Sequence, residues 1–147
     1  MAKDSLLFSE NDQQQIIAAI KSAETLTSGE VKVHIEKKCP TPDAMERAKE
    51  VFLFLNLHKT ALQNAVLFYL AYEDRKFAIL GDKGINEKVP ADFWDSTKDH
   101  LRHHFAKGQY VEGLVNGIAE AGEQLKTHFP FKSNDINELP DDISFGH

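Results

Sequence analysis

The segment from 65 to 71 constrains the fold of this chain more than any other feature. It reads Ala-Val-Leu-Phe-Tyr-Leu-Ala, an unbroken apolar run with polar residues on both sides. The run is too short for a typical helix and is typical of a strand that is covered on both faces. We therefore predict a central strand within a sheet that has helices on each side.

Two more strands are predicted next to this one in the sequence. Residues 76–81 follow it after the polar connection 73–75, so the two segments should form an antiparallel hairpin. Residues 30–36 alternate between aliphatic and polar side chains, which predicts a strand with one face in water. Because a helical segment separates 30–36 from 65–71, these two strands should be parallel, with a right-handed crossover.

Helices are predicted from apolar residues at helical spacing, at 9–26, 44–55, 90–107 and 111–125. Ser9 supplies a capping hydroxyl for the first helix, and Thr41-Pro42-Asp43 gives a similar start to the second. Residues 81–90 are expected to form a loop. The order of elements predicts an α/β fold, a three-layer αβα sandwich around a small mixed sheet. It forms one domain over residues 1–130, followed by an acidic, irregular tail over 131–147.

Composition restricts the class of function. The 147 residues include 17 Lys and Arg against 23 Asp and Glu, a formal charge of -6, which disfavours nucleic acid as a partner. The single cysteine, Cys39, excludes an internal disulfide. Because the sequence shows neither a signal peptide nor a long apolar stretch, we expect no membrane span and a cytoplasmic location. We also expect a monomer.

The predicted topology brings several oxygen-bearing side chains to one edge of the sheet. The strands at 30–36 and 65–71 start at this edge and the strand at 76–81 ends there. The residues gathered in this way are Glu30, Asn64, Asp82 and Glu87, with Asp92 in the first turn of the following helix. Calcium binds six to eight oxygen ligands of these kinds, so we predict a calcium site, with magnesium as the second choice. The alternative is an ordinary turn with solvated acids, because no EF-hand spacing is present.

Short motifs recur in a defined order along most of the chain. Leu7-Phe8-Ser9, Ser28-Gly29-Glu30-Val31 and Asn64-Ala65-Val66-Leu67 precede or open the first helix and the first two strands. They are followed by Gly81-Asp82-Lys83-Gly84-Ile85, Phe105, Gly108-Gln109-Tyr110 and Gly113-Leu114. In this order and spacing the chain resembles the TPM domain family, in particular a stand-alone bacterial form.

The resemblance implies an αβα sandwich with a four-stranded sheet, so one strand would lie outside the periodic segments. It also implies a pair of crossing loops held by divalent metal. The glycine-rich loop of the family matches residues 81–87, its first-strand acid matches Glu30, and its second-loop asparagine matches Asn64. Asp82 and Asn86 depart from the commoner pattern, which leaves open which side chains bind the metal.

Two functions remain open. The first is a non-enzymatic domain that binds divalent cations, acts as a metal-responsive binding or regulatory module, and has an unidentified protein partner. The second is a metal-dependent acid phosphatase, because some family members are described as such. Metal-assisted phosphoryl transfer needs a nucleophile or an activated water, and neither familiar phosphatase nucleophile pattern is present. Arg47 follows Cys39 by eight positions, outside a short phosphate-binding loop.

Histidines provide a further set of candidates. His100, His103 and His104 lie within one turn of a predicted helix, but no third zinc ligand is near them in the sequence. We therefore predict a solvated polar face there. His34, in the first strand, is predicted to be covered by a helix or hydrogen-bonded. For the acidic tail, a short peptide that binds a partner, a strap over the metal edge and a free terminus all remain open.

Overall fold

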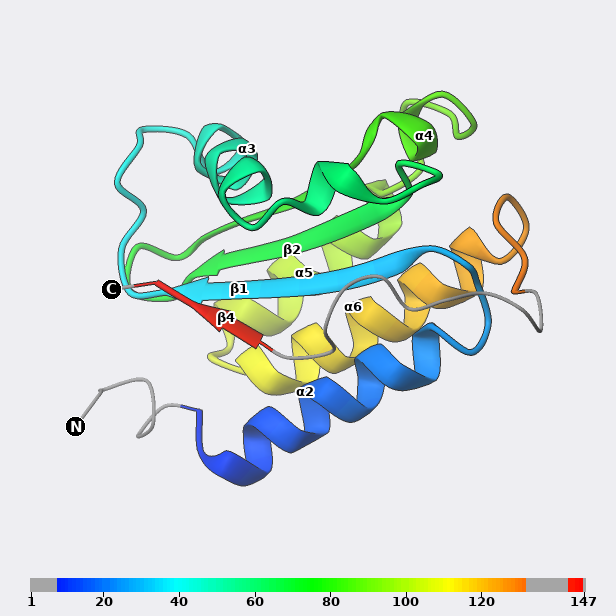
Figure 1. Ribbon diagram of the computed structural model, residues 1–147. Helices are drawn as coiled ribbons and strands as arrows, with labels where there is room; N and C mark the ends of the chain where they lie inside the picture. The colour runs from blue at the N-terminus through cyan, green and yellow to red at the C-terminus, as the bar shows by residue number, and fades with distance from the viewer. Residues whose placement is uncertain (1–7, 132–142, 147) are drawn as a thin grey trace.

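The computed structural model describes residues 8–131 and 143–146, and the element labels follow Figure 1. One mixed sheet, with strand order β3-β2-β1-β4, lies between two layers of helices (Figure 1). Helices α3 and α4 lie over one face, and α2, α5 and α6 lie over the other. The predicted αβα sandwich and the four-stranded sheet are therefore confirmed.

The pairing of the strands follows the predicted topology. The strands are β1 (Glu30–Glu36), β2 (Ala65–Ala71), β3 (Lys76–Gly81) and β4 (Ile143–Phe145). β1 runs parallel to β2, and β2 runs antiparallel to β3. The bounds of β1, β2 and β3 agree with the prediction, because each segment has the period or the unbroken apolar character of a strand.

The fourth strand lies in the segment that was predicted to be irregular, so that prediction is wrong for residues 143–145. β4 pairs in parallel with the outer side of β1, with Ser144 opposite His34. Three residues are too few to show a period of two, and the strand exists because β1 offers an edge for pairing. Most of the predicted tail, 132–142 and 147, lies outside the described residues.

The first two helices begin at residues whose side chains accept hydrogen bonds from free backbone N–H groups. α2 (Glu10–Ala23) starts at Ser9, whose hydroxyl accepts a 3.1 Å bond from the Asp12 N–H, while the Asp12 carboxylate accepts one from the Ser9 N–H. α3 (Ala44–Phe54) is capped by the Asp43 carboxylate and is followed by the short 3-10 helix η1 (Leu57–Lys59). α6 (Tyr110–Leu125) is the longest helix in the described part of the chain.

Two helix predictions need correction. The expected loop at 81–90 contains the short helix α4 (Lys83–Asn86), and α5 (Asp95–Ala106) begins five residues after Pro90. Turn hydrogen bonds from the Phe93 N–H to Pro90 O and from the Asp95 N–H to Asp92 O occupy the intervening segment. Four residues are too few to show helical periodicity, and α4 depends on a cap and on contact with a neighbouring loop.

The core has one part on each face of the sheet. The larger part, beneath α2, α5 and α6, includes Ile16, Val31, Phe68 and Ile118. The smaller part, beneath α3, includes Val51, Leu67 and Tyr69. The polar face of β1 was predicted to be in water and is instead buried, since Glu30, Lys32, His34 and Glu36 are each at most 5% exposed. These four residues share the sheet face on which α3 packs.

Candidate functional site

The start of β1, the start of β2 and the end of β3 meet at one edge of the sheet, as the topology predicted. The Glu30 N–H donates to Asn64 O at 3.2 Å, and the Asp82 N–H donates to Ala65 O at 2.9 Å. The Asn64 side-chain amide donates to Ser28 O at 3.1 Å. Three of the five predicted ligands, Glu30, Asn64 and Asp82, therefore lie at the same end of the sheet, which we call the loop-crossing end.

Two chain segments, 60–64 before β2 and 82–87 after β3, pack closely against each other here. The Gly84 N–H donates to Gln63 O at 2.9 Å. A Cβ at Gly84 would lie 2.2 Å from Leu62 O and 2.6 Å from Gln63 O, so only glycine fits at this position. Gln63 itself has a left-handed backbone, with φ of 50°. The resemblance implied crossing loops, and these contacts show the two loops in direct contact.

Asp82 stands at the start of α4, within this crossing. Its Oδ1 accepts the Lys83 N–H at 2.7 Å. Its Oδ2 is buried and has no hydrogen-bond partner among the residues that the structure describes. A buried carboxylate oxygen without a donor is costly, because nothing replaces the water that it has lost. A cation is one group that would compensate this oxygen.

The other predicted ligands differ in their surroundings. Glu30 is 4% exposed and Asn64 is 2% exposed, so both are buried beside the crossing. Glu87 caps the end of α4 and Asp92 lies in the turn before α5, and both are exposed. No cluster of three or more His, Cys, Asp or Glu side chains suited to a metal ion occurs within 8–131 and 143–146. A cation would therefore depend on Asp82, on amide oxygen and on loop carbonyls.

A second polar cluster, which the sequence reasoning missed, lies at the opposite end of β1. The Glu36 carboxylate accepts hydrogen bonds from Arg47 Nε at 2.8 Å, from Arg47 Nη2 at 3.0 Å and from the Tyr69 hydroxyl. Arg47 Nη1 also donates to Glu50 Oε1 at 3.1 Å. His34 Nε2 lies 3.4 Å from Glu36 Oε1. We call Glu36, Arg47, Tyr69 and His34 the Glu36 cluster.

The groups of this cluster have shifted proton affinities. Burial alone would raise the pKa of Glu36, but hydrogen bonds from Arg47 and Tyr69 outweigh burial and hold that pKa below its usual value. Burial lowers the pKa of His34, even though Glu36 favours its charged form. Burial and the bond to Glu36 raise the pKa of Tyr69. Near neutral pH the cluster therefore holds an ionised Glu36, a charged Arg47 and a neutral His34.

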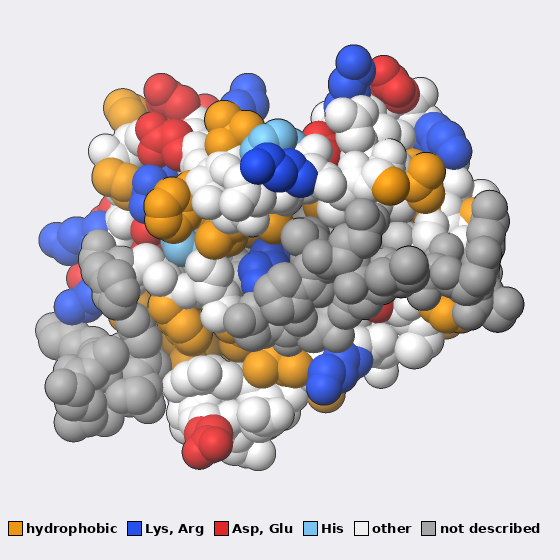
Figure 2. All heavy atoms as spheres, viewed as in Figure 1, with side chains coloured by type: hydrophobic (Ala, Val, Ile, Leu, Met, Phe, Trp, Pro, Cys, Tyr) orange, Lys and Arg blue, Asp and Glu red, His pale blue; other side chains and the backbone are white. Residues whose placement is uncertain are grey.

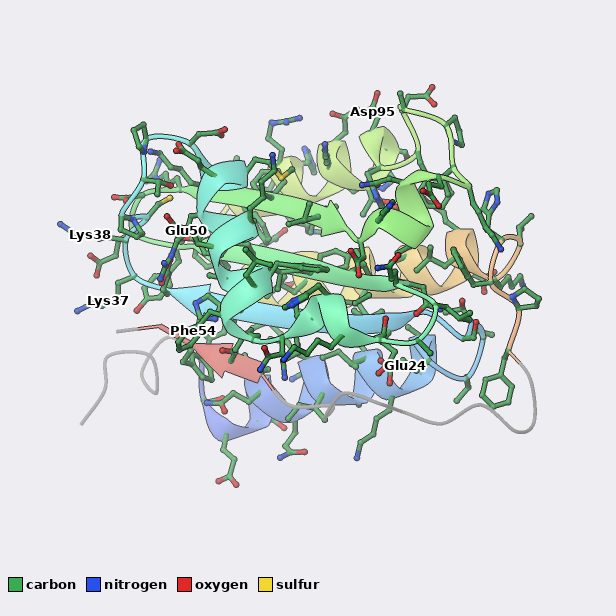
Figure 3. The ribbon with its side chains drawn as sticks, turned by 45° about the horizontal axis from the view of Figure 1, so that its top comes forward. Glu24, Lys37, Lys38, Glu50, Phe54 and Asp95 are labelled. Carbon is green, nitrogen blue, oxygen red and sulfur yellow. The ribbon has the colours of Figure 1, made fainter. Side chains whose placement is uncertain are left out.

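Two residues of this cluster, His34 and Arg47, form the polar wall of a cavity of about 410 Å³ between α3 and β4, together with Glu50 and Ser144. His34 Nδ1 lies 2.9 Å from Ser144 Oγ, which ties β4 to β1. Figure 3 places Phe54 at the end of α3 beside β4, with Glu50 about one turn earlier. Figure 2 shows hydrophobic side chains gathered over α3 and β4, and the Phe54 side chain there is 82% exposed. The alternation of residues 30–36 predicted that His34 and Glu36 share one face of the strand. It did not predict their contacts with Arg47 and Tyr69.

Two histidines of α5 make hydrogen bonds to α6 or to Gln109, the residue that precedes it. His100 Nδ1 pairs with Glu120 Oε2, and His104 Nδ1 pairs with Gln109 Oε1 at 3.0 Å. The His100 side chain is 56% exposed. These contacts and the exposure of His100 agree with the predicted polar face.

Two solved structures are similar to this chain. The BA42 protein of the psychrophilic bacterium Bizionia argentinensis is 46% identical, with a TM-score of 0.89 and 95% of each chain covered. The N-terminal domain of the cg2496 protein of Corynebacterium glutamicum is 14% identical, with a TM-score of 0.65, and covers 87% of this chain and 79% of its own. The second likeness shows the fold alone. No curated protein matches the chain.

Two further findings bear on classification. Within the described part of the chain, no helix is long and apolar enough to cross a membrane. The sequence profile of the TPM domain matches residues 2–124, which is most of the chain. Together with the 46% identity to the BA42 protein over nearly the whole length, this match shows that the chain belongs to the TPM domain family.

Proposed function

We propose that this TPM domain binds a divalent cation of the calcium type at the loop-crossing end, and that the bound cation orders segments 60–64 and 82–87. The observation that carries the proposal is Asp82 Oδ2, a buried carboxylate oxygen that lacks a hydrogen-bond donor among the described residues. It lies at the crossing of segments 60–64 and 82–87, where backbone carbonyls are also present. Ordering of these loops would make the domain a metal-responsive binding or regulatory module.

The chemistry of the donors favours calcium over transition metals. The side chains that the topology brings to this end, Glu30, Asn64 and Asp82, offer oxygen alone, and hard cations prefer oxygen. Magnesium remains the second choice, because it requires a stricter octahedral geometry. Few carboxylates contribute, so we expect an affinity toward the weak end of the calcium range. The described geometry gives no specific support to the phosphatase alternative.

The test is a titration of the full chain with calcium chloride after treatment with a chelator, followed by amide NMR. We expect saturable shifts at residues 60–65 and 81–87. Asp82→Asn should abolish them, because asparagine keeps the helix cap but removes the charge. Asp95→Asn, an exposed aspartate at the start of α5, is the matched control and should leave the titration unchanged.

Thermal unfolding gives a second readout of the same proposal. Calcium at a hundredfold excess over the dissociation constant should stabilise the native state by about 2.7 kcal/mol. Equal midpoints with calcium and with chelator would contradict the proposal, and so would a calcium shift that survives Asp82→Asn. Glu87→Gln and Asp92→Asn then report whether these exposed acids take part in binding.

A further inference from the structure

A cavity of about 200 Å³ lies where the β2–β3 hairpin meets the end of α5 and the start of α6. It is lined by Leu70, Phe77, Phe105 and Tyr110, together with two arginines, Arg75 and Arg102. β2 ends and β3 begins at this end of the sheet. The cavity is therefore at the opposite end from the loop crossing and does not share residues with the proposed cation site.

Aromatic rings form the wall of this cavity and hold one another in place. Phe77 and Phe105 meet edge to face, with ring centroids 5.3 Å apart. Phe105 and Tyr110 lie 5.6 Å apart, and the Tyr110 hydroxyl donates to Tyr72 O at 3.4 Å. Rings that pack on each other in this way form an apolar surface before any ligand arrives.

Among the described residues that line the cavity the two arginines alone are charged, and Asp99, the acid that pairs with Arg102, lies outside the lining. Arg75 lies in the hairpin turn, with a left-handed φ of 55°, and forms no hydrogen bond or ion pair with any described residue. Arg102 Nη1 donates to the exposed Asp99 at 2.9 Å, and its guanidinium lies 5.7 Å from the Phe77 ring centroid. Since a guanidinium has five N–H donors, most donors of this pair are unused within the described residues.

We propose that this cavity binds a small carboxylate with an apolar or aromatic body. Two guanidinium groups with unused N–H donors favour an anion, and a carboxylate matches the fork of N–H donors on each of them. The aromatic wall favours a ligand that also buries an apolar group. A volume near 200 Å³ suits a single ring with its acid group. The site would thus select for charge and for apolar surface together.

Three probes separate these two requirements. Benzoate has both the charge and the ring, benzamide has the ring without the charge, and inorganic phosphate has the charge without the ring. We expect benzoate, at constant ionic strength, to cause saturable amide NMR shifts at 73–77 and 102–110 of the full chain. Benzamide and phosphate should bind at least tenfold more weakly.

Two matched double variants test the arginines. Arg75→Gln with Arg102→Gln should weaken benzoate at least tenfold. The control is Lys21→Gln with Lys59→Gln, which removes the same net charge from exposed sites in α2 and η1. It should change the affinity for benzoate less than twofold. All four side chains are exposed, so we expect native spectra outside the altered positions.

Several results would overturn the proposal. Equal binding of benzoate and benzamide would show that charge is not selected, and equal binding of benzoate and phosphate would show that the aromatic wall is not used. Benzoate binding that survives loss of both arginines would remove the basis of the site. The absence of a saturable shift with benzoate would also contradict it.

Discussion

At the scale of single residues, the main contrast is between Asp82 and Glu36. Glu36 is buried and receives three donated hydrogen bonds from Arg47 and Tyr69, whereas Asp82 is half-buried and its buried Oδ2 receives none from the described residues. A carboxylate whose acceptors are satisfied stabilises the structure around it. One whose oxygen lacks a donor is a candidate for binding a ligand. The two carboxylates therefore have different expected roles.

Arg47→Met provides a test of the structural role of the Glu36 cluster. The substitution leaves the Glu36 carboxylate, whose side chain is 4% exposed, without its cation. Breaking a buried pair from one side costs about 3 kcal/mol, and we expect that loss in the free energy of urea unfolding. Glu36→Gln with Arg47→Met should recover part of it, because no buried charge is then left unpaired. A single variant as stable as the wild type would contradict this role.

At the scale of elements, the success of prediction depends on how many residues repeat a pattern. β1, β2 and β3 have six or seven residues each, and their alternation or apolar character predicted their bounds. α4 has four residues and β4 has three, and both depend on contacts distant in the sequence. The convergence of Glu30, Asn64 and Asp82 followed from topology. The bond between Arg47 and Glu36 did not, because it joins a helix to a strand whose polar face was predicted to be in water.

Gly84→Ala tests the packing between segments 60–64 and 82–87. A Cβ there would overlap Leu62 O and Gln63 O, so the backbone would have to move, at a cost of about 3 kcal/mol. Gly108→Ala is the comparison, since its φ is +75° but no atom lies within 4 Å of an added Cβ. That variant should lose about 1 kcal/mol from backbone strain alone. Chemical denaturation measures the free energy of unfolding of both variants. Equal losses in the two would contradict the close packing at Gly84.

At the scale of the whole molecule, the sheet separates two polar ends. β1 begins at Glu30 in the loop-crossing end and finishes at Glu36 in the Glu36 cluster. Because β1 and β2 are buried on both faces, each end is held by a rigid support. The family fold alone does not decide function, since function depends on the groups at such ends.

The stability of the molecule should fall toward acid pH. The pKa of His34 and the pKa of Glu36 are both lowered in the folded state, by burial and by Arg47 respectively. Each group thus stabilises the fold above its unfolded pKa, and this stability is lost as pH falls, from about 6.5 for His34 and about 4.5 for Glu36. Glu36, Arg47 and Lys32 are the charges that act on His34.

Thermal unfolding between pH 7.5 and pH 4 measures this dependence. His34→Gln should flatten the upper part of the curve, near pH 6, and leave the lower part in place. Glu36→Gln should flatten the lower part. A wild-type midpoint that rises on acidification would contradict the direction of both shifts.

The length of β2 has a consequence for how this domain can change over evolution. At about 3.3 Å per residue, a strand of seven residues separates its two ends by roughly 20 Å. Sites so far apart, with no common partner, contribute nearly independently to stability. Substitutions at the proposed cation site should therefore leave the proposed carboxylate site unchanged, and the scaffold between them need not be rebuilt.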